Sequence, residues 1–159
     1  MVIHLIITGY LLIILAVIHL IFPKRFNWEE EFSTVSLINK QMMYVHTLFI
    51  ALVVLLMGLL CITSSAALIE TVLGRRVCIG LTIFWVMRLL IQFVGYSSEL
   101  WKGKTFETAV HIVFIFLWTY FSFVFGIVAW GWLTTDDGPQ ITGNSRKSIR
   151  RLSSVVSRL

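Results

Sequence analysis

The sequence predicts an all-α integral membrane protein built as an up-down bundle of four transmembrane helices. Of its 159 residues, 58% are hydrophobic and 13% are charged, which leaves too little polar surface to cover a water-soluble globule. The apolar residues fall into four stretches, 1–22, 42–62, 77–94 and 109–133, each close to the ~20 residues that a spanning helix needs. Because backbone amides in hydrocarbon must be paired internally, we expect each stretch to be a helix.

The first stretch is expected to remain in the protein as a span, because it lacks the basic region and small-residue cleavage site of a signal peptide. The connections between spans are short, so consecutive helices should be antiparallel neighbours. We therefore expect one transmembrane domain over 1–133 and a separate C-terminal tail over 134–159.

The connection between the first two spans is predicted to hold a helix at the membrane surface, over 27–40. Asn27 can cap its start, and three glutamates follow in the first turn, where they complement the helix dipole. Apolar residues then recur at helical spacing. Trp28 is expected to anchor this helix at the interface between lipid and water.

The tail is predicted to form a basic amphipathic helix on the membrane surface. The pair Gly138 and Pro139 ends the fourth span, and from Ser145 onward apolar residues recur three or four positions apart. The basic residues between them are Arg146, Lys147, Arg150, Arg151 and Arg158. We expect these to bind anionic lipids, and the alternative is a solvated tail without structure. Nucleic-acid binding is not expected, because no aromatic residue follows Trp132 to stack on a base.

The distribution of basic residues favours both termini in the cytoplasm. The side with the first and third connections carries Lys24, Arg25, Lys40, Lys102 and Lys104. The opposite side carries Arg75, Arg76 and the five basic residues of the tail. Since the side richer in Lys and Arg tends to stay inside the cell, the first and third connections should face outward.

Polar residues of the spans are concentrated near the outward-facing end. Three of the four histidines lie at that end of three different spans: His19, His46 and His111. On the third span a polar stripe with i, i+4 and i+8 spacing rises toward the same end and consists of Arg88, Gln92 and Tyr96. Polar side chains at membrane depth are costly and usually face the interior of a bundle, so this layer is the candidate site.

Arg88 requires a countercharge, because a charged side chain inside a span is costly when it is unpaired. None of the four predicted spans contains an acidic residue that could supply it. We expect it to come from Glu99 or Glu107 at the rim, from carbonyl and phenol oxygens, or from a bound anion. Alternatively, Arg88 extends its charged group to the interface, or pairs with Glu107 only to fix the helix packing.

The histidines suggest two kinds of cofactor. His46 and His111, on the second and fourth spans, would be diagonal in a ring of four helices and could hold a b-type haem, with Arg88 or rim residues near its propionates. Arg88 looks deeper than the histidines, however, whereas propionates are expected to point toward water. Together with His19 they could instead bind zinc, copper or iron, although a cationic Arg88 would weaken such a site. The remaining alternative is that each histidine bonds to a neighbouring helix or lies among the headgroups.

Three functions are compatible with these features. The first is a haem- or metal-binding redox protein that transfers electrons. The second is a non-catalytic accessory or assembly subunit of a larger membrane complex, in which the aromatic-rich fourth span contacts a neighbouring subunit. The third is a small-anion binder or, as a homo-oligomer, a transporter that selects its substrate through Arg88. No phosphate-binding glycine loop, HExxH motif or nucleophile next to a histidine is present, so no catalytic residue is assigned.

Overall fold

The computed structural model describes residues 1–95 and 105–134, and within these ranges its regular structure is entirely helical. The helices of this described part are α1 (Val2–Arg25), α2 (Trp28–Glu31), α3 (Leu37–Thr63), α4 (Ser65–Glu70), α5 (Val72–Val94) and α6 (Thr105–Thr134). Four of them are long and apolar enough to cross a membrane: α1, α3, α5 and the Thr108–Gly131 part of α6. The predicted all-α fold with four potential spans is therefore confirmed.

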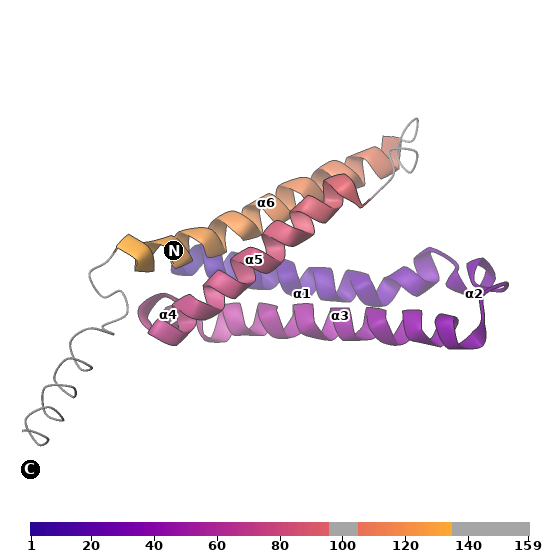
Figure 1. The fold of residues 1–159 in the computed structure, drawn as a ribbon, viewed down its shortest axis with the longest axis horizontal. Coiled ribbons are helices and arrows are strands. Elements are labelled where there is room, and N and C mark those ends of the chain that lie inside the picture. Colours follow the sequence, from indigo (N-terminus) through magenta and orange to yellow (C-terminus); the bar gives the residue numbers. More distant parts are fainter. Residues whose placement is uncertain (96–104, 135–159) are drawn as a thin grey trace, which may run out of the picture.

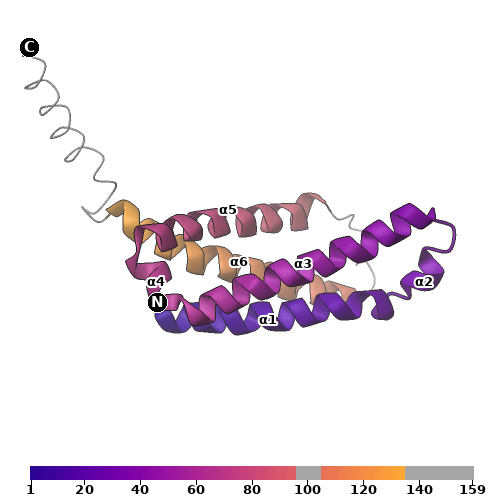
Figure 2. The ribbon, with the colours of Figure 1, turned by 90° about the horizontal axis from the view of Figure 1, so that it is seen from below.

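The long helices form two antiparallel pairs, α1 with α3 and α5 with α6 (Figure 1). The contacts within each pair are extensive, whereas the pairs touch each other mainly through α1, which contacts α4 and α6. In Figure 1 the pairs lie close together at the end that carries the N-terminus and α4, and they diverge toward the end that carries α2. Figure 2 shows from below how α4 joins α3 to α5.

Two glycines allow the close packing of α1 against α3. A Cβ atom on Gly58 would lie 2.8 Å from the carbonyl oxygen of Gly9, and a Cβ atom on Gly9 would lie 2.8 Å from the carbonyl oxygen of Gly58. In a membrane, van der Waals contact between closely approaching backbones is a main source of helix association. The absence of both side chains therefore sets the distance between these helices.

A stripe of aromatic side chains holds α5 against α6. Trp85 of α5 stacks on Trp118 of α6, with ring centroids 5.1 Å apart and an interplanar angle of 17°. Phe121 meets the Trp85 ring edge-on at 4.9 Å. Aromatic pairs in these geometries contribute about 0.5–1.5 kcal/mol beyond the burial of their surface. Farther along α6, Val124, Phe125 and Val128 are also buried.

Burial divides the bundle into two halves. We define the histidine half as residues 17–25, 37–50, 86–94 and 105–117, and the core half as the remainder of the four long helices. Nearly all buried side chains of the described spans belong to the core half, and Gln92 is the single buried side chain described in the histidine half. The divergence of the two helix pairs thus leaves few side chains buried in the histidine half. This half contains His19, His46 and His111.

A short corner connects the two pairs at the end of the core half. The Thr71 hydroxyl donates to the carbonyl of Ala67 at 2.7 Å and accepts from the amide of Gly74 at 2.9 Å, so that it ends α4 and begins α5. Nε of Arg75 donates to the carbonyl of Ile69 at 2.7 Å. A Cβ atom on Gly74 would lie 2.5 Å from Cα of Leu68, so only glycine fits there.

The surface helix predicted over 27–40 is much shorter in the structure. Only the four residues of α2 are helical before turns at 32–35, and residues 37–40 form the first turn of α3. Asn27 occupies the N-cap position of α2, but its side chain makes no capping hydrogen bond: its backbone is left-handed with φ of 46°, and its side-chain amide donates to the Glu30 carboxylate. Trp28 packs edge-on against Tyr44 of α3, with ring centroids 5.4 Å apart. The tail beyond residue 134 lies outside the described residues.

The glycine contact predicts unequal effects of glycine-to-alanine substitutions. Gly58→Ala should lower the free energy of unfolding by about 1–3 kcal/mol, because the added methyl group meets the α1 backbone. Gly80→Ala is the matched control, since a Cβ atom there meets nothing within 4 Å. It should leave stability unchanged or raise it through helix propensity. Unfolding of the detergent-solubilised protein measures both, and equal losses would contradict the assigned packing.

Candidate functional site

Three polar side chains on α5 and α6 are linked by hydrogen bonds inside the spans. Nη1 of Arg88 donates to Oε1 of Gln92 at 3.1 Å, and Nε2 of Gln92 lies 2.7 Å from Nδ1 of His111. Gln92 is 5% exposed and lies seven residues after Trp85, on the same buried face of α5. We refer to Arg88, Gln92 and His111 as the polar cluster.

The polar cluster determines where His111 carries its proton. A guanidinium group can only donate hydrogen bonds, so Arg88 turns Oε1 of Gln92 toward itself and leaves Nε2 facing the imidazole. Because Nε2 of Gln92 is a donor, Nδ1 of His111 accepts, and a neutral His111 carries its proton on Nε2.

Arg88 lies deeper in the α5–α6 pair than His111. Gln92 contacts His111 and Trp85 stacks on Trp118, so in this antiparallel register Arg88 is about one helical turn, ~6 Å, below His111. The guanidinium group accordingly lies over Trp118, which is seven residues farther along α6 than His111. Both side chains are partly exposed, although they belong to segments able to span the membrane.

An aromatic stack lies under the guanidinium group. Cζ of Arg88 is 5.0 Å from the ring centroid of Trp118, a cation–π contact of about 0.5–2 kcal/mol. Trp118 stacks on Trp85 and on Phe114, with centroids 5.1 Å and 5.3 Å away. The stack and Gln92 hold the cation in place, and Arg88 and His111 each make a further interaction besides these.

The other histidines occupy the α1–α3 pair and have different environments. Nδ1 of His19 lies 2.7 Å from the carbonyl oxygen of Leu15, and because a carbonyl only accepts, a neutral His19 carries its proton on Nδ1. His46 is exposed on α3. His4 lies in the core half, where its Nδ1 is 3.2 Å from the Tyr120 hydroxyl of α6.

The expected haem or metal centre is not supported by this arrangement. No group of three His, Cys, Asp or Glu side chains that could hold a metal ion occurs within the residues described. A histidine that ligates through Nε2 normally donates its Nδ1–H to a carbonyl or carboxylate oxygen. His19 has this arrangement, but His111 has the opposite one, and His46 is not enclosed.

Several predicted site residues lie outside the described part of the protein. These are Tyr96, the side chain of Glu107, and the basic residues Arg146, Lys147, Arg150, Arg151 and Arg158. Their expected roles in anion, propionate and membrane-surface binding stay predictions.

The sequence analysis did not assign Trp85 and Trp118 to the site. Their spacing contained a usable signal: Trp85 precedes Arg88 by three residues and Gln92 by seven, and Trp118 follows His111 by seven. These intervals put the aromatic and polar residues on one face of each helix. The choice of that face as the contact between α5 and α6 required the structure.

Comparisons with protein-family models, with curated proteins and with solved structures find no match to this chain. The polar cluster is therefore the basis for assigning a function.

The polar cluster predicts that His111 and His19 are opposite tautomers when both are neutral. Nitrogen NMR of labelled protein at a pH where both are neutral should show the proton of His111 on Nε2 and that of His19 on Nδ1. Gln92→Leu removes the donor to His111, so the His111 signals should shift toward a mixture of tautomers while those of His19 stay unchanged. The same tautomer in both histidines of the unsubstituted protein would refute the assigned geometry.

Proposed function

We propose that the protein is an integral membrane protein that binds a small anionic group at the polar cluster. One observation carries this proposal: the hydrogen bonds of Gln92 combine a fixed cation, Arg88, with a histidine whose proton is on Nε2. Both side chains carry N–H donors, and each also makes a further interaction within the protein. An anion accepts from such groups, whereas a metal ion needs a lone pair.

The surroundings of the cluster strengthen an interaction with an anion. Hydrogen bonds that involve a charged partner are roughly twice as strong as neutral ones, and a low dielectric increases the attraction further. None of the four spans contains an acidic residue, so the net charge of their membrane part near the site is positive. Gln92 and the aromatic stack position the guanidinium group before a ligand arrives, which reduces the ordering that binding requires.

The arrangement supports binding more directly than transport. The two helix pairs meet through buried side chains of the core half, including Leu12, Trp85 and Phe121. Within the described residues these side chains block a path for a solute from the histidine half to the opposite end of the bundle. Transport through this chain would require several copies, as expected for a four-helix protein. Crosslinking in the membrane tests that extension.

A haem- or metal-dependent redox function predicts that the purified protein contains a haem or a metal ion. If the polar cluster binds an anion, detergent-purified protein should show no Soret absorbance and no stoichiometric zinc, copper or iron, because His111 presents a donor in place of a lone pair. Absorbance spectra and metal analysis of the same sample provide the measurement. A Soret band that disappears in His111→Ala would favour the redox function instead.

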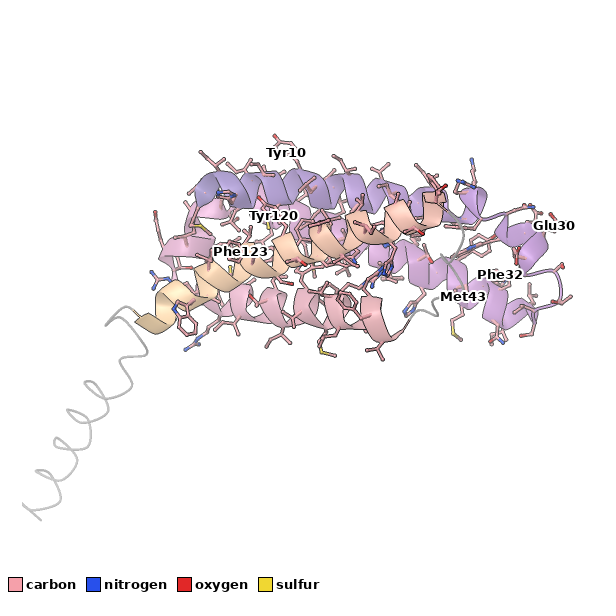
Figure 3. The ribbon with its side chains drawn as sticks, turned by 90° about the horizontal axis from the view of Figure 1, so that it is seen from above. Tyr10, Glu30, Phe32, Met43, Tyr120 and Phe123 are labelled. Atoms are coloured by element: carbon pink, nitrogen blue, oxygen red, sulfur yellow. The ribbon has the colours of Figure 1, made fainter. Side chains whose placement is uncertain are left out.

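The accessory-subunit function draws on the exposed aromatic residues of α6. Phe116 and Phe123 are 72% and 64% exposed, and Figure 3 shows Phe123 on the outer side of this helix. Lipid covers such a surface as readily as a partner subunit does. Native mass spectrometry of the gently extracted protein distinguishes the two, since a subunit would retain a second protein.

Removal of the cation at the cluster should weaken anion binding. Thermal unfolding of the purified protein in zwitterionic lipid nanodiscs is followed with inorganic phosphate or acetate as the probe, and either should raise the midpoint of the unsubstituted protein. Arg88→Leu should weaken binding by roughly ten- to hundredfold, the equivalent of 1.5–3 kcal/mol for a charged hydrogen bond.

Arg76→Leu is the matched control for this experiment. It removes the same charge from the same helix, but Arg76 is exposed near the opposite end of α5. It should bind the probe as the unsubstituted protein does. If both variants bind equally well, the polar cluster has only a packing role.

A further inference from the structure

We propose that the contact between the two helix pairs binds internal water, which accepts hydrogen bonds from the indole N–H groups of Trp85 and Trp118 and bonds to the hydroxyl group of Thr8. These side chains belong to α5, α6 and α1, respectively. The site lies in the core half and is independent of anion binding at the polar cluster.

The three side chains carry buried polar atoms that the protein leaves unpaired. Thr8, Trp85 and Trp118 are 0%, 1% and 3% exposed. Oγ1 of Thr8 and Nε1 of each tryptophan have no hydrogen-bond partner within the described part of the protein. An unpaired polar group inside a membrane protein is costly, because neither lipid chains nor apolar side chains can bond to it. Each of these atoms therefore favours a bound partner from outside the chain.

Thr8 departs from the pattern of four other hydroxyl groups in the spans. The hydroxyl groups of Thr63, Thr82, Thr119 and Ser122 each donate to the carbonyl oxygen four residues earlier, at 2.7 or 2.8 Å. This bond within the helix is a common way to pair the hydroxyl group of a helical Ser or Thr. Thr8 does not make it, so its hydroxyl group is directed to a partner beyond α1.

The contact between α1 and α6 puts the three side chains at a similar level along the bundle. These helices run in opposite directions (Figure 1), and Nδ1 of His4 lies 3.2 Å from the Tyr120 hydroxyl. Thr8 is about 6 Å beyond His4 along α1, and Trp118 is about 3 Å from Tyr120 in the same direction. Trp85 stacks on Trp118. The levels of the three side chains therefore differ by only about half a helical turn.

Burial places the three side chains in the interior that the helix pairs share. Thr8 lies on one face of α1 with Leu5 and Leu12, and all three are 0% exposed. Leu5, Leu12, Trp85 and Trp118 belong to one continuous cluster of buried side chains. Water bound in this layer is therefore within the part of the bundle where α1 meets the α5–α6 pair.

Water has the hydrogen-bonding capacity that these groups require. An indole N–H group can only donate, so both tryptophans need an acceptor, whereas a hydroxyl group donates and accepts. A metal cation offers no acceptor. None of the buried side chains described is charged, which favours a neutral ligand over an anion. Arg88 contacts the ring face of Trp118 and leaves the N–H group of that indole to the water.

Transfer of magnetisation from water to the indole protons tests the proposal. Full-length protein labelled with ¹⁵N at tryptophan is studied by NMR in nanodiscs of deuterated phosphatidylcholine, and Trp85→Phe and Trp118→Phe assign the two signals. Both protons should receive magnetisation from water, although each tryptophan lies about 20 Å from the start of its helix. If either proton receives none, the proposed site is wrong.

Thr8→Val distinguishes a hydroxyl group bound to water from an unpaired one. It should reduce the transfer to both indole protons and raise the equilibrium constant for unfolding about tenfold, because the water loses a partner. Thr8→Ser keeps the hydroxyl group and should keep the transfer. Thr82→Val is the matched control: its hydroxyl group bonds to the Cys78 carbonyl, so the transfer should stay unchanged. A Thr8→Val protein that is more stable than the unsubstituted one would overturn the proposal, because only the loss of an unpaired hydroxyl group is favourable.

Discussion

A guanidinium group inside a membrane span has to be stabilised by its neighbours, and the α5–α6 pair is arranged around that requirement at Arg88. Gln92 supplies an oxygen acceptor, and Trp118 supplies the negative face of an indole ring. Both contacts come from residues that also hold the two helices together. The position of the cation therefore depends on the same aromatic stripe that stabilises the pair, and the protonation of His111 follows from it through a single amide group.

The two halves of the bundle differ in how closely their side chains are packed. The core half is closely packed, with glycines between α1 and α3 and stacked indoles between α5 and α6. The histidine half buries little besides Gln92 and leaves apolar side chains to the bilayer. In water such exposure would be unfavourable, but in lipid it has almost no cost, because hydrocarbon chains solvate these side chains as well as a protein interior does. A membrane protein can thus keep one half open without losing the stability of the other.

Local sequence features predicted much of this structure, and relationships between helices were harder to predict. The four spans follow from the length of their apolar stretches, and the i, i+4 spacing of Arg88 and Gln92 predicted their contact. The surface helix over 27–40 was overestimated, because a turn at 32–35 interrupts its periodicity. The prediction that His19, His46 and His111 converge assumed that the four helices form a symmetric ring. The pairing of α1 with α3 depends on tertiary contacts such as that of Gly9 with Gly58, which no local pattern of polarity reveals.

The two helix pairs are linked near both ends of α1 by side-chain contacts with α6. Nδ1 of His4 is 3.2 Å from the Tyr120 hydroxyl, and at the other end Cζ of Arg25 lies 6.0 Å from the centroid of the Phe106 ring. The second contact is a long approach made by an exposed, flexible side chain, so it restrains the spacing of the pairs less than the buried side chains of the core half do. A change in the separation of the two pairs therefore costs less free energy at the end that carries His19 and His111 than at the end that carries His4.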